Sequence, residues 1–245
     1  MTVLWYDLLD STNAEVLRRC GELDNLSVVA ARSQTAGRGQ RGNTWSAAAG
    51  ENLTFSILLR LPPDLPTKQV IAINALAALS VWDYLRSRDV PALIKWPNDI
   101  YVGKRKICGI LVENRMSPDA FISVIGIGIN VNQTLFPASL PNPTSLSRET
   151  GAVYDTDKEL EGFLHVFGTL YPSWQEDPEG LCNRYAENLF QAGIPCPYRD
   201  LRSGEVFTGI IRGVDGNGLL SVERKTAGGV PAVSQYGFKE IGYIL

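Results

Sequence analysis

The sequence is poor in the side chains that most metal sites and hydrolytic triads require. Its 245 residues include one histidine, His165, and four cysteines, none in a Cys-x-x-Cys pair. The usual zinc sites are therefore excluded, and only His165 remains for a histidine-based triad. His165 falls on the polar face of an apolar-periodic segment, so we expect it on the surface.

Long hydrophobic runs and a secretory leader pattern are also missing. The most apolar stretch, residues 70–85, is interrupted by Asn74 and Asp83 and is too short to span a bilayer. The formal charge of −3 argues against a general binder of nucleic acids or membrane surfaces. We therefore expect a cytoplasmic protein with reduced thiols and no membrane partner.

Acidic residues are absent from one long segment, between Asn25 and Gly50. About twenty residues there join two expected strands without any periodicity, and loops of that length are usually functional or disordered. Three glycines and two arginines lie within it: Gly37, Gly39, Gly42, Arg38 and Arg41. Glycine lets backbone approach a ligand, and arginine supplies a permanent cation. The segment predicts an anion site, against the alternative of a mobile surface loop with solvated arginines.

Two common phosphate-binding motifs do not explain this loop. Residues 37–42 match Gly-x-Gly-x-x-Gly, but no strand directly precedes them and no helix follows. Asn43 occupies the place of the P-loop lysine. The loop is expected to bind an anion with another geometry.

Apolar patterning predicts an α+β fold in two parts. Strands are expected at residues 3–8, 26–31, 52–61, 93–96, 100–102, 106–113 and 121–131, and helices at 12–23, 67–86, 157–174 and 179–191. Hairpin-type strands with helices before and after them predict a mixed sheet with helices on one side. Thr12 with Glu15 is typical of a capping box, and Thr67 is expected to cap the long helix. After the break at residues 193–197, short alternating strands predict a small β barrel. The predicted domains are 1–192 and 193–245.

Five segments in this order resemble the biotin protein ligase family. They are residues 10–13 (Asp-Ser-Thr-Asn), 37–42 with Trp45, 95–99 (Lys-Trp-Pro-Asn-Asp), 106–111 (Lys-Ile-Cys-Gly-Ile-Leu) and 126–130 (Gly-Ile-Gly-Ile-Asn). The resemblance implies a biotin/lipoate ligase-like catalytic domain followed by an SH3-like barrel. It also implies ligation in two steps: biotin, ATP and Mg²⁺ give biotinyl-AMP, and a lysine of a biotin carboxyl carrier domain then displaces AMP. The acceptor would be acetyl-CoA carboxylase or another biotin-dependent carboxylase.

The same resemblance assigns roles to individual residues. The biotin-binding set is Ser11, Thr12, Asn13, Gln34, Gly37, Arg38, Gly39, Gln40, Lys106 and Gly109. The adenylate-binding set is Arg38, Arg41, Trp45, Asn98, Lys106 and Asn130. The catalytic set is Arg38, Lys106 and Asp99, where Asp99 serves a metal or acts as base for the acceptor lysine. Lys106 also opens an apolar run, which independently favours a side chain directed into a cleft.

Some alternatives stay open at this point. Many relatives carry a basic residue where this chain has Gln40, and Arg41 is the candidate replacement. A lipoate or octanoate ligase or transferase of the same fold is the second interpretation, and an RNA-binding module without enzymatic activity is the third. Because the biotin motif begins at Asp10, we expect no N-terminal DNA-binding domain and no operator binding. A homodimer and a ligand or acceptor contact by the C-terminal domain are further expectations.

Overall fold

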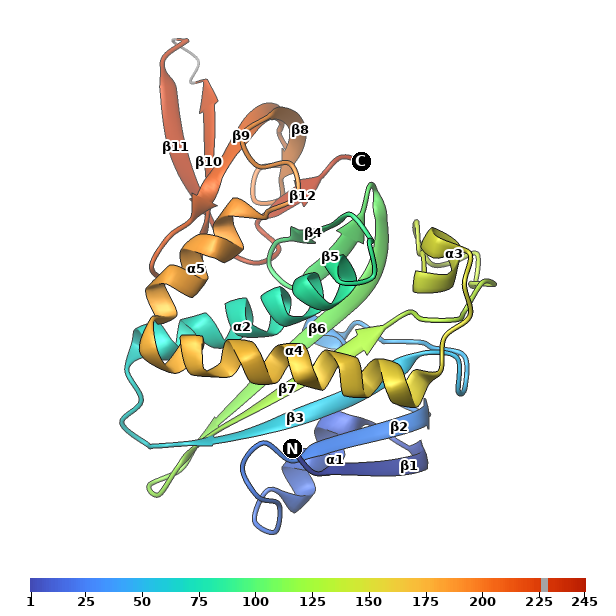
Figure 1. Ribbon diagram of the computed structural model, residues 1–245. Coiled ribbons are helices and arrows are strands. Elements are labelled where there is room, and N and C mark those ends of the chain that lie inside the picture. Colours follow the sequence, from blue (N-terminus) through green and yellow to red (C-terminus); the bar gives the residue numbers. More distant parts are fainter. Residues whose placement is uncertain (226–228) are drawn as a thin grey trace.

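A seven-stranded mixed sheet forms the centre of the molecule (Figure 1). The computed structural model describes residues 1–225 and 229–245, apart from the side chains of residues 41 and 225. In spatial order the strands are β1 (Val3–Leu9), β2 (Val28–Gln34), β3 (Leu53–Leu61), β7 (Phe121–Ile129), β6 (Arg105–Met116), β5 (Asp99–Val102) and β4 (Ala92–Lys95). Only β1 and β2 are parallel within this sheet, so the predicted mixed sheet is confirmed.

Three helices cover one face of this sheet. They are α2 (Thr67–Arg86), α4 (Thr156–Glu176) and α5 (Pro178–Glu187). Helix α2 lies against β4, β5 and β6, and the other two helices pack on α2. Phe55 and Ile57 of β3 and Phe163 of α4 are fully buried here. As predicted, His165 points away from this core and is exposed.

Helix α1 (Thr12–Arg19) lies on the opposite face, so the expectation of helices on one side is wrong. Its Val16 joins a separate buried cluster with Val29, Leu58 and Val124. Successive strand residues point to opposite faces, so Leu58 faces α1 while Ile57 faces the other helices. Apolar residues on both faces of β2, β3 and β7 require a cover on each side.

The helix starts also differ from the expected caps. Ser11 caps α1, its hydroxyl accepting a hydrogen bond from the backbone N–H of Ala14 at 3.5 Å, and Thr12 is the first helical residue. The Thr12–Glu15 capping box is therefore wrong, as is Thr67 as a cap, because α2 starts after Pro66 without a side-chain cap. The sequence also did not predict α3 (Leu146–Thr150) or a 3₁₀ turn at Gln40–Gly42.

The last fifty residues form a second, antiparallel sheet. Its order is β11 (Pro231–Tyr236), β10 (Leu220–Lys225), β9 (Val206–Val214), β8 (Pro195–Asp200) and β12 (Ile241–Tyr243). This confirms a small β domain, but in the described part of the chain β11 and β12 are not paired to close a barrel. No helix in that part is long and apolar enough to cross a membrane.

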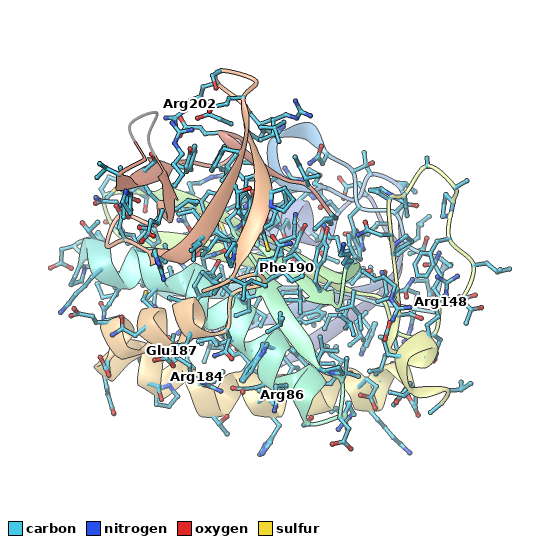
Figure 2. All side chains as sticks on the ribbon, turned by 90° about the horizontal axis from the view of Figure 1, so that it is seen from above. Arg86, Arg148, Arg184, Glu187, Phe190 and Arg202 are labelled. Atoms are coloured by element: carbon cyan, nitrogen blue, oxygen red, sulfur yellow. The ribbon has the colours of Figure 1, made fainter. Side chains whose placement is uncertain are left out.

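The two sheets share one continuous core. Side chains fill the space between the second sheet and the helices, with Phe190 at the junction (Figure 2). The Phe190 ring lies 5.7 Å from the ring of Tyr101 in β5 and 6.2 Å from that of Tyr243 in β12. Buried Tyr198 and Ile211 of the second sheet belong to the same cluster as Phe55. The C-terminal sheet is thus held firmly against the end of the first sheet that carries β4 and β5.

Candidate functional site

A cavity opens on the α1 face of the first sheet, where the central strands carry glycine. The strand register places Thr54, Gly128, Gly109 and Asp99 side by side in one row across β3, β7, β6 and β5. The two glycines leave the middle of this row without side chains. The cavity is therefore built into the strands themselves, and these residues line it.

The next row of the sheet supports the polar side of the cavity. Gly126 lies there between Ser56 and Leu111. A Cβ on Gly126 would lie 2.1 Å from Asn13 Oδ1, so glycine is required for Asn13 to rest on the sheet. The buried Ser56 hydroxyl is within hydrogen-bonding distance of Asn13 Oδ1 (2.5 Å) and Thr12 Oγ1 (2.7 Å).

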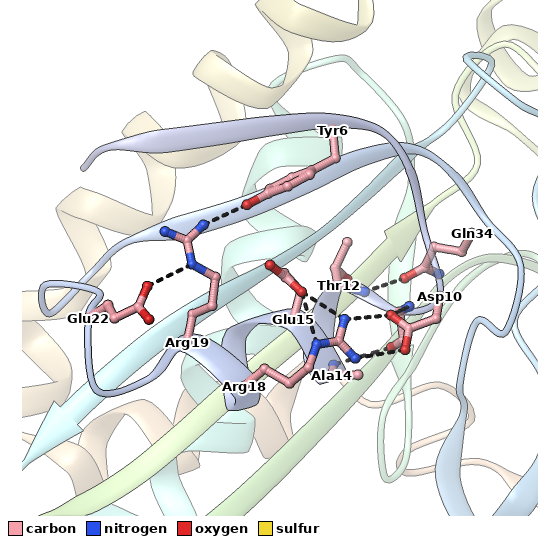
Figure 3. A network of polar contacts seen from close by, with 10 residues as sticks. Tyr6, Asp10, Thr12, Ala14, Glu15, Arg18, Arg19, Glu22 and Gln34 are labelled. Atoms are coloured by element: carbon pink, nitrogen blue, oxygen red, sulfur yellow. Dashed lines mark hydrogen bonds and ion pairs between the residues drawn. The ribbon is translucent and has the colours of Figure 1, made fainter.

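The N-terminal turn of α1 completes this polar side. Gln34 Oε1 accepts a hydrogen bond from the Thr12 N–H at 2.7 Å, which joins β2 to the helix (Figure 3). Asp10 accepts hydrogen bonds from Arg18 at 2.8 Å and from the Ser11 N–H at 2.7 Å. The Arg18 guanidinium holds the pKa of Asp10 well below its usual range. An ion pair and a backbone hydrogen bond thus connect Asp10 to α1. Ser11, Thr12, Asn13 and Gln34 all line the cavity.

The glycine-rich segment folds into a small hairpin over the cavity. The Gly39 N–H donates to the Asn43 carbonyl at 2.7 Å, and the Trp45 N–H donates to the Gly37 carbonyl at 3.0 Å. A Cβ on Gly37 would lie 2.3 Å from the Trp45 carbonyl oxygen, so this turn requires glycine. The hairpin brings Arg38, Gln40 and Trp45 to the cavity.

Two polar atoms of the hairpin are buried in the cavity without a protein partner. The Trp45 indole lies on the glycine floor, where a Cβ on Gly128 would come within 2.3 Å of the ring. Among the described residues neither Trp45 Nε1 nor Gln40 Oε1 has a hydrogen-bond partner. Buried polar groups are usually paired, because leaving one unpaired costs free energy. The hairpin thus leaves one donor and one acceptor unpaired in the described part of the chain.

Lys106 enters the cavity because β6 contains a bulge. In the β5–β6 ladder Tyr101 faces Lys106 and Ile100 faces Cys108, so Ile107 is the extra residue. In a regular strand Lys106 and Gly109 would point to opposite faces; the bulge turns them to the same one. Lys106 Nζ lies 2.6 Å from Asp99 Oδ1. The expectation that Lys106 points into a cleft is confirmed.

The segment before Asp99 is held by side chains from two helices. The Pro97 carbonyl accepts hydrogen bonds from Asn74 Nδ2 at 2.7 Å and from the Tyr185 hydroxyl at 2.8 Å. Asn98 Nδ2 donates to the Ile110 carbonyl at 2.5 Å. These contacts fix Asn98 and Asp99 at the rim of the cavity.

Lys95 precedes this segment and faces the C-terminal sheet. Its ammonium group lies 5.0 Å from the Tyr101 ring centre and 4.7 Å from that of Tyr243, a residue of the second sheet. Burial lowers the pKa of Lys95, and the negative charge of Asp99 opposes that shift. Lys95 therefore links the two sheets and is not among the residues that line the cavity.

The structure brings most of the expected residues together. Those lining the cavity are Ser11, Thr12, Asn13, Gln34, Arg38, Gly39, Gln40, Trp45, Asn98, Asp99, Lys106 and Gly109. Gly37 instead lines a second hollow behind the hairpin. Asn130 is buried directly after β7, where its amide donates to the Thr144 carbonyl at 2.9 Å, and it is not among the residues that line the cavity. The Arg41 side chain lies outside the described atoms.

Sequence reasoning missed several residues. Glu113 joins Asn13 and Arg38 through hydrogen bonds of 2.8 and 2.9 Å; its position four residues after Gly109 in a strand was an available signal. Phe238, which follows β11 in the second sheet, also lines the cavity, and no local pattern indicates it. The described residues contain no group of three or more His, Cys, Asp or Glu side chains that could hold a metal ion.

Comparison with known proteins defines the class. The sequence model of the biotin/lipoate A/B protein ligase family matches residues 5–130, about half of the chain. The chain belongs to this family.

Two relatives and one solved structure show how similar this chain is to individual members of the family. A biotin–acetyl-CoA-carboxylase ligase of Paracoccus denitrificans is 33% identical over 226 residues, covering 86% of this chain and 90% of the relative. The bifunctional ligase/repressor BirA of Bacillus subtilis is 32% identical over 231 residues, covering 90% of this chain and 69% of the relative. The biotin protein ligase of Aquifex aeolicus, solved with biotin and ATP, has a TM-score of 0.74 at 23% identity and covers 98% of this chain and 97% of its own. That last likeness establishes the fold.

Proposed function

We propose that this chain is a biotin protein ligase. It joins biotin to ATP as biotinyl-AMP and transfers the biotinyl group to a lysine of a biotin carboxyl carrier domain, in acetyl-CoA carboxylase or another biotin-dependent carboxylase. The observation that carries the proposal is one cavity that combines a buried polar cradle, Arg38 of the hairpin and Lys106 of the bulged strand. Family membership supports the same activity.

The first step joins two anions. A biotin carboxylate oxygen attacks the α-phosphorus of ATP, and the bond to the pyrophosphate oxygen breaks. The protein needs no nucleophile of its own, because positioning and positive charge lower this barrier. Lys106 lies at the cavity floor and Arg38 in the hairpin above it, so both can face the carboxylate and the phosphates.

The second step transfers the acyl group. The amine of the acceptor lysine attacks the carbonyl carbon of the adenylate, loses a proton, and AMP leaves. Asp99 is the carboxylate among the residues lining the cavity, which suits it as base for this amine. Its 2.6 Å pair with Lys106 holds it at the reacting end of the ligand.

The cavity offers suitable contacts for biotin and adenylate. Thr12, Asn13 and Gln34 line the cavity with hydrogen-bonding groups, which suits the ureido ring of biotin better than the chain of lipoate or octanoate. The Trp45 N–H is unpaired among the described residues, and the indole can stack on adenine. The hairpin would shield the adenylate from hydrolysis.

Mg²⁺ is assigned to ATP rather than to a protein cage. Magnesium usually keeps several waters and binds through substrate phosphates with one or two carboxylates. Asp99 is the carboxylate positioned to assist, and the ion would offset phosphate charge.

The proposal places the reaction in the cytoplasm. It also includes a homodimer as an assembly, because β1 ends the sheet order with one neighbour, leaving an edge open to a second copy; sedimentation velocity tests that assembly.

The test is ATP–pyrophosphate exchange with Mg²⁺, supplying biotin, lipoate and octanoate in turn. We expect exchange with biotin alone, followed by biotinyl transfer to a purified carboxyl carrier domain. Exchange with lipoate or octanoate instead would assign the chain to the sister ligases. The absence of pyrophosphate exchange with all three acids, together with salt-sensitive RNA binding, would contradict the proposal.

A further inference from the structure

One carboxylate oxygen joins the two halves of the ligand site. Glu113 Oε2 accepts a hydrogen bond from Asn13 Nδ2 at 2.8 Å and another from Arg38 Nη2 at 2.9 Å. Asn13 belongs to the buried polar cradle at the start of α1, and Arg38 belongs to the hairpin. Glu113 itself comes from β6, the strand beneath both.

The geometry shows where the hairpin rests. Gly109, Leu111 and Glu113 alternate along β6, so all three face the hairpin side. A second hollow separates the hairpin from the strand and is lined by Gly37, Arg38, Leu111 and Glu113 among others. In the part of the chain that the structure describes, the other hydrogen bonds of residues 37–45 stay within the hairpin. The ion pair with Glu113 is thus its polar tie to the sheet.

The contact leaves Arg38 able to bind a ligand. A guanidinium group carries five N–H donors. Only Nη2 is used by Glu113, and Arg38 still lines the main cavity. The pair therefore orients the guanidinium and does not use up its donors.

We propose that Glu113 is a positioning residue that tethers the glycine-rich hairpin to the polar cradle. Through Asn13 and Arg38 it couples binding in the cradle to closure of the hairpin. That the ligand is biotin rests on the proposed function; the tether itself does not.

The chain offers a matched control pair in the second sheet. Arg212 and Glu223 are 3.0 Å apart, with side chains 46% and 28% exposed, against 43% and 29% for Arg38 and Glu113. Partly exposed ion pairs add little to stability. Without Glu113, Asn13 Nδ2 still has the Leu111 carbonyl as a partner at 3.3 Å. Glu113→Ala and Glu223→Ala should therefore change the melting temperature by similar small amounts.

The experiment combines two measurements on Glu113→Ala, Glu113→Gln and Glu223→Ala. Amide hydrogen exchange in the free protein follows Gly39, Asn43 and Trp45, whose N–H groups are bonded within the hairpin. Calorimetry with biotin alone gives its dissociation constant. We expect Glu113→Ala to speed exchange at these amides several-fold and to weaken biotin binding about tenfold, the size of a lost charge-assisted hydrogen bond. Glu113→Gln retains an acceptor for Asn13 and should recover part of both effects, while Glu223→Ala changes neither.

Other results of these two measurements would contradict the proposed tether. Unchanged hairpin exchange in Glu113→Ala would do so, even with weaker biotin binding, because Glu113 would then act on Asn13 alone. Faster exchange with unchanged biotin binding would refute the coupling. If wild type bound no biotin, the proposed function would fail, and hairpin exchange would still decide whether Glu113 holds the hairpin.

Discussion

The two faces of the seven-stranded sheet use the same strands for different purposes. On the face under α2 and α4, Phe55, Ile57 and Phe163 are fully buried against apolar neighbours. On the face that carries α1, the same strands present Thr54 and Ser56, and the adjacent strand β7 presents Gly126 and Gly128. Stability is concentrated on the first face. The second face has fewer large apolar side chains, which leaves space and polar groups that a ligand can contact.

The two faces also differ in how exposed their ion pairs are. Lys106, Asp99, Arg38 and Glu113 form two partly exposed ion pairs at the cavity. On the helix face, the comparable pair of Arg88 and Glu159 is more buried and is joined by the Tyr84 hydroxyl at 2.6 Å from Glu159. The pair on the helix face is thus enclosed by a third partner, whereas the two pairs at the cavity remain accessible to a ligand.

The largest effect is expected on the helix face. Phe163→Ala removes a ring whose centre lies 5.0 Å from that of Phe55, and should lower the free energy of unfolding by about 3–5 kcal/mol. Urea denaturation measures the loss, while the biotin dissociation constant of the folded fraction should stay within about twofold. Phe163→Leu, a smaller change, should fall between wild type and alanine. A loss below about 1 kcal/mol would contradict the division between the faces.

Lys106→Ala is expected to have the opposite profile. Removing a cation that faces developing charge should slow pyrophosphate exchange about a hundredfold, or roughly 2.7 kcal/mol. The free energy of unfolding should change by less than about 1 kcal/mol, because the pair with Asp99 is partly exposed. Exposed Lys104, two residues earlier, provides the control Lys104→Ala. Exchange close to the wild-type rate in Lys106→Ala would exclude the assigned role.

Gly128→Ala tests the glycine floor. The added Cβ would lie 2.3 Å from the Trp45 ring, so the indole must move. We expect the KM for ATP to rise about tenfold, the size of a lost aromatic contact, with a smaller change in the KM for biotin. Gly21→Ala, where a Cβ meets no atom within 4 Å, is the control. If Gly128→Ala and Gly21→Ala had the same KM for ATP, the glycine floor would not position Trp45 for the nucleotide.

A smaller effect is expected from the second sheet. Phe238→Ala removes a lining side chain contributed from outside the first sheet and should raise the KM for ATP or biotin about threefold to fivefold. Phe136, a half-buried loop residue outside the cavity, gives the control Phe136→Ala. If both variants matched wild type, the second sheet would have a supporting role only.

The smallest effect is expected at Gln40. Gln40→Arg adds the basic residue that the family resemblance led us to expect at this position, but Arg38 and Lys106 already supply positive charge at the cavity. The exchange rate should change by no more than about twofold. A larger increase would show that Arg38 and Lys106 alone leave the site short of positive charge.

The sequence was sufficient for features that depend on local pattern. The long helix α2, the mixed sheet and the small β domain follow from periodicity and turn residues. The glycine-rich loop and Lys106 could be singled out because unusual residue types are concentrated there. The placement of α1 could not be predicted, because β2, β3 and β7 are apolar on both faces and periodicity does not say which helix covers which face.

Site residues that are brought together only by tertiary contacts could not be predicted from local sequence patterns. Glu113 lay in a predicted strand, but its partners Asn13 and Arg38 come from elements far away in sequence. Phe238 reaches the cavity only because the second sheet packs beside β4 and β5. The expected role of Asn130 rested on a motif, and only the fold shows that its amide is bonded to the Thr144 carbonyl.

The bulge at Ile107 makes the length of the Lys106–Gly109 segment as informative as its composition. Two residues separate the lysine from the glycine, a spacing that would be wrong for a flat strand and is right only with one residue looped out. A flat strand with the same four residues would leave every side-chain type available yet rotate the ammonium group to the helix side. Ile107 is itself fully buried in the core, so the extra residue is enclosed by the fold. The packing of one apolar side chain and the direction of the lysine beside it are thus set by a single irregularity of the ladder.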